Sequence, residues 1–238
     1  MRISEFLLSP TESVLTLKEI HLSKENREAI DQLIREYKHV AVLSEYGLPI
    51  DNKIFLFGHT GCGKTTTAKA IAQALDKKIL IVDLSSIVSS RLGETAKNMS
   101  NVFQKAIREK AVLFLDEFDA LGRMREQEDK DSSEMKRLVN SIIQLIDQLP
   151  NDTLLIAATN HSAVIDSAIL RRFQLKLRYD APDREHLDYY YDSLLSRFPE
   201  EFRNIKRKYQ ISYAEAKDIA LKAVKGKIIS NLEKDQGE

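Results

Sequence analysis

The segment 58–65 carries residue types that suit phosphate chemistry. It reads Gly-His-Thr-Gly-Cys-Gly-Lys-Thr and fits the pattern G-x-x-x-x-G-K-[ST] at every fixed position. Glycines let backbone N–H groups curve around phosphate oxygens, and a helix that begins after the loop adds partial positive charge. The pattern therefore predicts a phosphate-binding loop. The residues that we expect to contact a nucleotide here are Gly58, Thr60, Gly61, Cys62, Gly63, Lys64, Thr65 and Thr66.

Two side chains of this loop have specific expected roles. Lys64 should reach the β- and γ-phosphates of ATP, and the Thr65 hydroxyl should bind Mg²⁺. The context agrees, because the apolar run 54–57 precedes the loop and a helical pattern, TTAKAIAQAL, follows it. A glycine turn that merely happens to precede Lys-Thr is the alternative, and the flanking strand and helix speak against it.

Cys62 lies between two glycines of the loop and is the single cysteine of the chain. One cysteine excludes an internal disulfide framework and a cysteine-rich zinc site. The simpler interpretation of Cys62 is a small residue that fills space. The alternative is a redox-sensitive brake on nucleotide binding, which a mild thiol oxidant would reveal.

A second segment supplies two adjacent carboxylates. Asp116 and Glu117 follow the apolar run 111–115, which has the character of a buried strand. Ligands of doubly wound sheets bind in the crevice at the carboxyl ends of the strands. We therefore expect Asp116 to hold Mg²⁺ and Glu117 to act as a general base toward an attacking water. Solvated charges after a strand are common, so this pair is informative only together with the phosphate loop.

The pattern around these motifs predicts an α/β fold, because apolar strands alternate with amphipathic helices. Nearly continuous apolar strands indicate a parallel sheet that is covered on both faces. We expect a five-stranded parallel sheet of the P-loop NTPase type, flanked by helices and followed by a small all-helical lid. The expected strands are 53–57, 78–84, 111–115, 153–158 and 174–179, and the expected helices between them are 64–75, 94–109, 133–149 and 163–170.

The pattern changes after residue 180, where only helical signals remain. One apolar stripe runs from Leu187 to Phe198, and a second comprises Phe202, Ile205 and Tyr209. Ser212 opens a third helix, with Glu215 completing a capping box. We therefore expect three regions: an N-terminal helical segment at 1–46, a nucleotide-binding α/β domain at 47–180 and a helical lid at 181–238.

The composition of the chain limits the classes of partner that we expect it to bind. The chain of 238 residues has 36 Lys and Arg against 36 Asp and Glu, so its net charge is zero. Binding of nucleic acid through bulk charge is therefore not expected. The apolar runs fall far short of the ~20 residues that span a bilayer, and the first residues lack an export signal. The sequence predicts a cytoplasmic protein without membrane insertion.

From about Gly47 to Tyr179 the sequence resembles the AAA+ ATPases. Gly47-Leu48-Pro49 resembles the adenine-side segment of that family, and residues 116–121, Asp-Glu-Phe-Asp-Ala-Leu, resemble its second acidic motif. Residues 157–160, Ala-Ala-Thr-Asn, are similar to the strand end that carries sensor 1. The resemblance implies that Gly47 and Leu48 bind nucleotide and that Asn160 orients the lytic water or touches the γ-phosphate. Asn160 could also simply close a turn after a strand.

Residues 165–173 end in Arg171-Arg172-Phe173 and resemble a segment that is best matched in the katanin and spastin branch. In that branch the two arginines reach the γ-phosphate of the neighbouring subunit. The resemblance therefore implies that Arg171 and Arg172 are arginine fingers. Cations at the end of a helix are favoured in any case, which is the alternative explanation.

The chain departs from the family in its pore loop and its lid. Gly93-Glu94-Thr95 match the family, but Arg91 stands where threading relatives carry an aromatic residue. An aromatic side chain grips polypeptide through sequence-tolerant contact area, so continuous threading is disfavoured here. Residues 212–215 occupy the place of S-G-A-D or a sensor arginine in relatives. The 46 residues before Gly47 are also too few for a typical substrate-recruiting domain.

The resemblance implies Mg²⁺-dependent ATP hydrolysis by a homo-oligomer, a hexameric ring, that binds ATP and ADP. The ring would remodel an unidentified protein client or a co-encoded partner. One alternative is a nucleotide-gated switch that recruits an effector such as a protease or nuclease. Others are a DNA-acting loader ATPase and a non-catalytic scaffold, and the intact motif residues speak against the scaffold.

Overall fold

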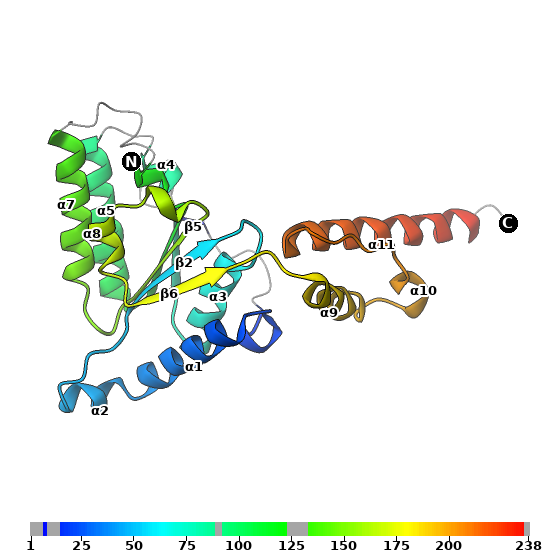
Figure 1. Ribbon diagram of the computed structural model, residues 1–238, viewed down its shortest axis with the longest axis horizontal. Coiled ribbons are helices and arrows are strands. Elements are labelled where there is room, and N and C mark those ends of the chain that lie inside the picture. The colour runs from blue at the N-terminus through cyan, green and yellow to red at the C-terminus, as the bar shows by residue number, and fades with distance from the viewer. Residues whose placement is uncertain (1–6, 9–14, 89–91, 123–132, 236–238) are drawn as a thin grey trace. The chain divides into compact units, whose positions relative to one another are not determined.

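The computed structural model describes residues 7–8, 15–88, 92–122 and 133–235. These residues form two compact units. The first combines residues 1–58 with 64–178, and the second combines residues 59–63 with 179–238, as far as they are described. Figure 1 labels the helices and strands.

The first unit is built on a sheet with the strand order β1-β3-β4-β5-β2-β6. Neighbouring pairs among β3, β4, β5 and β2 are parallel, and the β6 arrow in Figure 1 runs in the same direction as β2. The prediction of a five-stranded parallel sheet is therefore confirmed. The antiparallel edge strand β1 was not predicted. The strands are β1 (Leu7–Leu8), β2 (Lys53–Gly58), β3 (Ile79–Asp83), β4 (Val112–Asp116), β5 (Leu154–Thr159) and β6 (Leu175–Tyr179).

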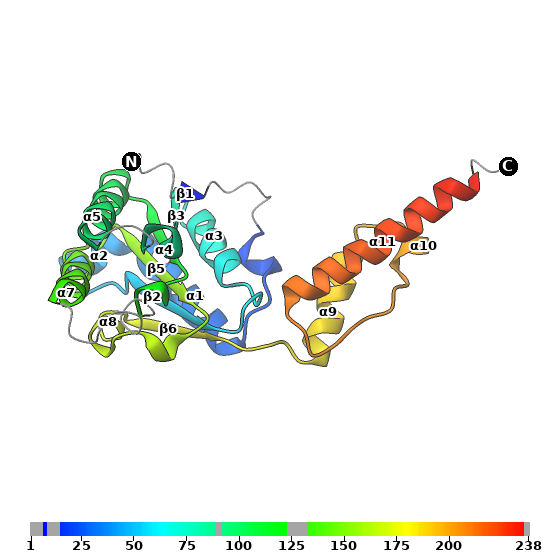
Figure 2. The ribbon, with the colours of Figure 1, turned by 90° about the horizontal axis from the view of Figure 1, so that it is seen from above.

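Helices cover both faces of this sheet. Figures 1 and 2 show α1 and α3 on one side of the strands and α5 and α7 on the other. Shorter helices and turns connect these elements. The helices of the first unit are α1 (Lys24–Lys38), α2 (Val40–Glu45), α3 (Lys64–Ala74), α4 (Leu84–Val88), α5 (Leu92–Glu109), α7 (Ser133–Asp147) and α8 (Ser167–Leu170), with 3-10 turns at Leu17–Glu19 and Ser162–Val164.

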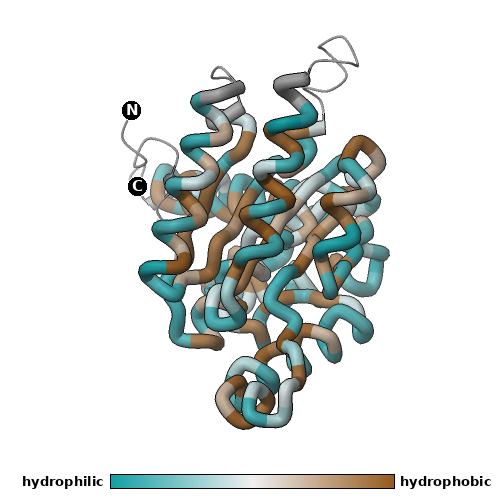
Figure 3. Tube along the Cα trace, turned by 90° about the vertical axis from the view of Figure 1, so that its left-hand side faces the viewer, coloured by the Kyte–Doolittle hydropathy of each residue, from teal (hydrophilic) through white to brown (hydrophobic). Residues whose placement is uncertain are grey.

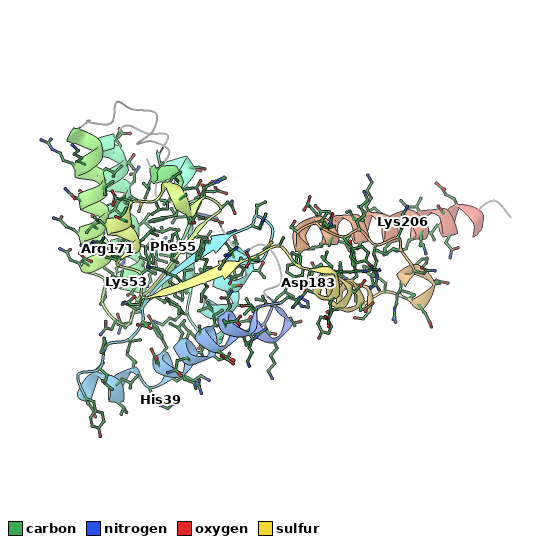
Figure 4. All side chains as sticks on the ribbon, viewed as in Figure 1. His39, Lys53, Phe55, Arg171, Asp183 and Lys206 are labelled. Carbon is green, nitrogen blue, oxygen red and sulfur yellow. The ribbon has the colours of Figure 1, made fainter. Side chains whose placement is uncertain are left out.

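Apolar strand residues fill the core because both faces of the sheet are covered. Every residue of β5 is buried, and alternate residues such as Leu155 and Ala157 pack in one cluster with α5 and α7. Figure 3 shows helices that alternate between hydrophobic and hydrophilic positions, as expected for helices with one buried face. Phe55, labelled in Figure 4, packs its ring near those of Phe118 and Phe173, with centroids 6.3 and 5.4 Å away.

The second unit has its own small core. Its helices are α9 (Arg184–Leu195), α10 (Glu200–Arg203) and α11 (Tyr213–Asp235). Leu187 and Tyr191 of α9 pack against Ala216 and Ala220 of α11. The predicted capping box is confirmed, because Ser212 Oγ accepts from Glu215 N at 3.3 Å while the Glu215 carboxylate accepts from Ser212 N at 2.8 Å.

Two predicted helices differ from the structure. The stripe of Phe202, Ile205 and Tyr209 is not a helix, since α10 ends at Arg203. These three side chains still pack on the core of the second unit, so a loop that lies along two helices produces the same spacing of apolar residues. The predicted helix at 163–170 is also shorter: only α8 is α-helical, because the Asp166 side chain caps it by accepting from Ala168 N.

Gly122 follows the second acidic motif and packs directly on the turn at 162–164. A Cβ atom at this position would lie 2.4 Å from the Val164 carbonyl oxygen. We predict that Gly122→Ala lowers the free energy of unfolding by about 1–3 kcal/mol, as overpacking in a core does. Thermal or denaturant unfolding monitored by circular dichroism measures the change.

Gly226 supplies the control, since it lies exposed within α11 and a Cβ added there would meet nothing within 4 Å. Gly226→Ala should leave stability unchanged or raise it by about 0.5–1 kcal/mol, because alanine favours the helix. An equal response of both variants would contradict the close packing of Gly122.

Candidate active site

Lys64 begins α3 and its side chain is almost fully buried, with 7% relative exposure. Its ammonium Nζ donates to the Gly58 carbonyl oxygen at 2.8 Å and to Asn160 Oδ1 at 2.7 Å. Gly58 ends β2 and Asn160 directly follows β5. Because β2 and β5 are parallel neighbours, their carboxyl ends meet and hold the lysine between them.

Thr65 and Asp116 face each other across the same edge of the sheet. Thr65 Oγ1 donates to Asp116 Oδ2 at 3.0 Å, and Asp116 Oδ1 accepts from the Glu117 backbone N at 3.0 Å. The two residues that the sequence assigned to a magnesium site are therefore in contact, one at the start of α3 and the other at the end of β4.

Glu117 adopts a left-handed backbone conformation with φ of 51°. This conformation costs a residue with a side chain about 1–3 kcal/mol and is common at active sites. The Glu117 carboxylate Oε1 lies 3.5 Å from Asn160 Nδ2, at the long limit for a hydrogen bond. Lys64, Asn160 and Glu117 thus form one chain of polar contacts.

Burial raises the pKa of the Asp116 carboxyl above its ordinary value, and the nearby Asp83 carboxylate adds to that increase. Hydrogen bonds from the Glu117 amide and from Thr65 act in the opposite direction but do not cancel it. Asp83 ends β3 in register with Asp116. The Asp83 carboxylate also caps α4, since its Oδ1 accepts from Ser85 N at 2.8 Å.

The remaining loop residues belong to the second unit, where they contact the start of α11. The Gly61 carbonyl oxygen accepts from Ala214 N at 3.1 Å. A Cβ at Gly61 would lie 2.7 Å from Ser212 Oγ, and φ of this residue is +68°, so only glycine fits without strain. Cys62 is 3% exposed and its thiol points at the Thr60 carbonyl oxygen, which agrees with the simpler, space-filling interpretation.

Gly63 and Thr66 complete the predicted loop. Gly63 also has a positive φ of 99°, and Thr66 lies half-buried in the first turn of α3. Their contact with a nucleotide stays a prediction.

Gly47 and Leu48 lie at the end of α2. Gly47 N donates to the Ser44 carbonyl oxygen, and Leu48 N donates to that of Leu43. This is a Schellman motif, whose left-handed residue is typically glycine, and φ of Gly47 is +67°. The Leu48 side chain is left 52% exposed. The glycine of this pair therefore has a purely structural explanation, in addition to the proposed adenine-side role.

The two arginines at the end of α8 differ in their surroundings. Arg172 Nη1 donates to the Ala168 carbonyl oxygen at 2.6 Å, and its Nε lies 3.3 Å from Asp147 Oδ1. Arg171, labelled in Figure 4, is exposed at the C-cap of the helix. Arg172 is therefore held within its own chain.

Three residues of the site region were not assigned a role from the sequence. Asp83 is one, and the buried hydrogen-bonded pair of Asp119 and Thr159 comprises the other two. Polar residues at the ends of otherwise apolar strands were the available signal. Arg91, which stands where threading relatives carry an aromatic residue, lies outside the described residues.

Comparison with known proteins identifies the class. Residues 54–181, more than half of the chain, match the model of the ATPase family associated with various cellular activities (AAA). The chain belongs to this family of ATPases.

Individual relatives agree with this assignment. The chain is 34% identical over 221 residues to an uncharacterized AAA family ATPase, y4kL, of Sinorhizobium fredii, which covers 92% of the chain and 67% of that protein. It is 30% identical over 183 residues to the ATP-dependent zinc metalloprotease FtsH 2 of Sphaerobacter thermophilus. This similarity covers 75% of the chain and 28% of that protein. It is 34% identical over 172 residues to the proteasome-activating nucleotidase of Pyrococcus furiosus, covering 68% and 42%.

The chain thus spans less than half the length of the last two relatives. None of the three is named a katanin or a spastin, so the assignment to that branch stays a prediction. Among the helices that the structure describes, none has the length and apolar character that crossing a membrane requires.

The raised pKa of Asp116 has a consequence for stability. The folded state favours the protonated carboxyl, so the stability that this group contributes is present at low pH and is lost as the pH rises through the folded pKa. Above the folded pKa the ionised carboxylate of Asp116 therefore destabilises the fold relative to the protonated carboxyl. We predict that Asp116→Asn raises the melting temperature at pH 7 by a few degrees, and that the difference closes at acidic pH.

Differential scanning calorimetry of the nucleotide-free protein measures this effect. Asp218→Asn, at a surface position of α11, is the control and should leave the melting temperature unchanged. A lower melting temperature for Asp116→Asn at pH 7 would show that its hydrogen bonds outweigh its burial.

Proposed function

We propose that this chain hydrolyses ATP with Mg²⁺ at the edge of its sheet, as a subunit of an oligomeric ring that remodels a protein partner. The observation that carries the proposal is the convergence of Lys64, Thr65, Asp116, Glu117 and Asn160 at the carboxyl ends of β2, β4 and β5. This is where ligands of open α/β sheets bind.

The donor set fits magnesium. Thr65 Oγ1 and Asp116 Oδ2 are hard oxygen ligands that already lie 3.0 Å apart. No cluster of three or more His, Cys, Asp or Glu that could hold a metal occurs among the described residues. Mg²⁺ suits such a sparse site, since it keeps several waters and takes its remaining ligands from substrate phosphates. When bound, it would neutralise charge that develops on the phosphate oxygens.

Glu117 is the proposed general base. Its carboxylate would accept the proton of the water that attacks the γ-phosphorus, while the bond to the leaving ADP oxygen breaks. Asn160 lies beside it and would hold that water by a hydrogen bond. The contact between Asn160 Oδ1 and Lys64 Nζ fixes which end of the amide faces the lysine. The Asn160 Nδ2 donor is then directed toward Glu117.

Lys64 supplies positive charge for the phosphates. Backbone amides of residues 58–65 would surround the β-phosphate, with Lys64 bound to the β- and γ-phosphates. The lysine starts from a position between two oxygen acceptors, Gly58 O and Asn160 Oδ1. Its exchange of these partners for phosphate oxygens couples ATP binding to the position of Asn160.

Arg171 is the better candidate for an arginine finger that acts on a neighbouring subunit. Arg172 is engaged with Asp147 and Ala168 of its own chain, whereas Arg171 is exposed. We therefore assign Arg171 to contact with the γ-phosphate of the next subunit, and Arg172 to holding the end of α8 in place. The assignment requires an oligomer, in agreement with a hexameric ring.

A protein partner is favoured over nucleic acid. The names of two relatives, a zinc metalloprotease and a proteasome-activating nucleotidase, describe work with proteins. The chain has no excess of positive charge that would attract nucleic acid. We propose that the ring and its client or co-encoded partner act in the cytoplasm.

Two substitutions separate binding from hydrolysis. We predict that Lys64→Ala abolishes ATP binding in calorimetry, because the main cation of the site is lost. Glu117→Gln should bind ATP normally, lose at least about 10²-fold in turnover as expected for loss of a general base, and accumulate as ATP-bound oligomers in size-exclusion chromatography with light scattering.

Glu233→Gln, an exposed carboxylate of α11, controls for the loss of one charge and should behave as the wild type. Wild-type turnover by Glu117→Gln would refute the proposed mechanism.

A mixing experiment tests the arginine. Arg171→Ala should lose on the order of 10³-fold in turnover, as measured for arginine fingers, and Arg172→Ala should lose much less. Arg171→Ala mixed with Glu117→Gln should regain part of the activity, because a Glu117 site of one subunit can meet an intact Arg171 of the other. If the mixture stays as inactive as its components, or if Arg171→Ala is fully active alone, Arg171 does not act across subunits.

A further inference from the structure

A buried hydrogen bond joins the ends of β4 and β5 beside the candidate site. Thr159 Oγ1 donates to Asp119 Oδ1 at 2.6 Å, and the two residues are only 1% and 0% exposed. A buried carboxylate is costly unless hydrogen bonds compensate it, and an apolar residue would fill the same space at lower cost. The pair therefore calls for an explanation beyond packing.

On the β5 side, this bond shapes the turn that carries Asn160. Thr159 Oγ1 also accepts from His161 N at 2.9 Å, so this hydrogen bond closes a turn around Asn160, the residue between them. The acceptor of this turn is Thr159 Oγ1, and its hydrogen bond to Asp119 holds it in place. The turn therefore encloses the Asn160 backbone. Since χ angles follow the backbone, the direction of the Asn160 amide depends on this turn.

On the β4 side, the same bond lies two residues beyond Glu117. Phe118 N donates to the Ala158 carbonyl oxygen at 2.8 Å, which continues the contact between the two strands past the end of the sheet. Glu117 has φ of +51°, a conformation that persists only when neighbouring residues hold it. Asp116 anchors it on one side, and Phe118 with Asp119 anchors it on the other.

We propose that Asp119 and Thr159 are a positioning pair, whose hydrogen bond sets the separation of the Glu117 carboxylate and the Asn160 amide for ATP hydrolysis. The inference rests on the proposed function, in which these two groups handle the attacking water. Neither Asp119 nor Thr159 touches the reacting atoms. A displacement of about 1 Å at such groups costs on the order of 10²-fold in rate.

A purely structural role makes a different prediction. A pair that only stabilises the fold would change the melting temperature and leave the turnover of the folded protein unchanged. A positioning pair changes kcat in folded protein and leaves the affinity for ATP nearly intact, because Lys64 and the phosphate loop still bind the nucleotide.

The test uses Thr159→Val, which removes the hydroxyl and keeps the side-chain shape, with Thr159→Ser as the matched control that keeps the hydroxyl. Both are assayed in the full chain below their melting temperatures. We expect Thr159→Val to lose on the order of 10²-fold in kcat with a Kd for ATP within about threefold of the wild type. Thr159→Ser should recover most of the turnover.

A second pair of variants approaches the bond from Asp119. Asp119→Ala removes the acceptor and should show the same split between kcat and Kd, whereas Asp119→Asn keeps an oxygen acceptor and should retain most of the turnover. The double variant Asp119→Ala/Thr159→Val should lose little more than either single variant, because both remove the same bond. If Thr159→Val does not fold, the Asp119 variants decide.

Wild-type kcat in Thr159→Val or Asp119→Ala overturns the proposal, and so does an equal loss in Thr159→Ser. Failure of both Thr159→Val and Asp119→Ala to fold would assign the pair to stability alone. Glu117→Gln, measured in parallel, keeps the two claims apart. If it is inactive while Thr159→Val is fully active, only the positioning role fails. If it is as active as the wild type, the proposed function fails.

Discussion

The parallel register of β4, β5 and β2 is the constraint on which the candidate site depends. In this register Leu115 lies opposite Ala157, and Phe57 lies opposite Thr159, so the three strands end together. The residues that follow their ends then meet. Because side chains alternate between the faces of a sheet, a slip of one residue in β4 would turn Asp116 away from Thr65. The packing of apolar residues on both faces holds the strands in this register. The register in turn determines which polar residues meet at the site.

Two features of the candidate site are energetically unfavourable, although the core around them is stable. Burial disfavours the ionised form of Asp116, and Glu117 has an unfavourable backbone conformation. Such features persist only where the surrounding structure is rigid. Here the rigidity comes from Phe118, whose ring packs against Phe55 and Phe173, and from the close approach of Gly122 to Val164. The ends of the strands can therefore carry charged groups in fixed positions.

Much of this arrangement was predictable from the sequence, and the reasons are local. Continuous apolar runs identified the five parallel strands, and the spacing of Gly58, Lys64 and Thr65 identified the loop before α3. Ser212 and Glu215 predicted the start of α11 because a capping box depends on residues three positions apart. The helical spacing of Phe202, Ile205 and Tyr209 was misleading, since packing on the core of the second unit does not require a helix.

The contacts that define the site were not predictable in the same way. Lys64 and Asn160 are 96 positions apart, and their contact follows from the pairing of β2 with β5. The bond between Asp119 and Thr159 likewise depends on how β4 and β5 end. The two-residue strand β1 is too short for a period to be recognised. Spacing shows which residues are available, and strand order decides which of them meet.

The central claim is that ATP and Mg²⁺ bind together at this edge of the sheet. Isothermal titration calorimetry of the folded wild-type chain with ATP, with and without Mg²⁺, tests it most directly, using Thr65→Val to remove the hydroxyl that we propose as a ligand of Mg²⁺. The account predicts saturable binding that Mg²⁺ strengthens in the wild type, and a much smaller effect of Mg²⁺ in Thr65→Val. Folded wild-type protein that gives no binding heat at millimolar ATP and Mg²⁺ would contradict it.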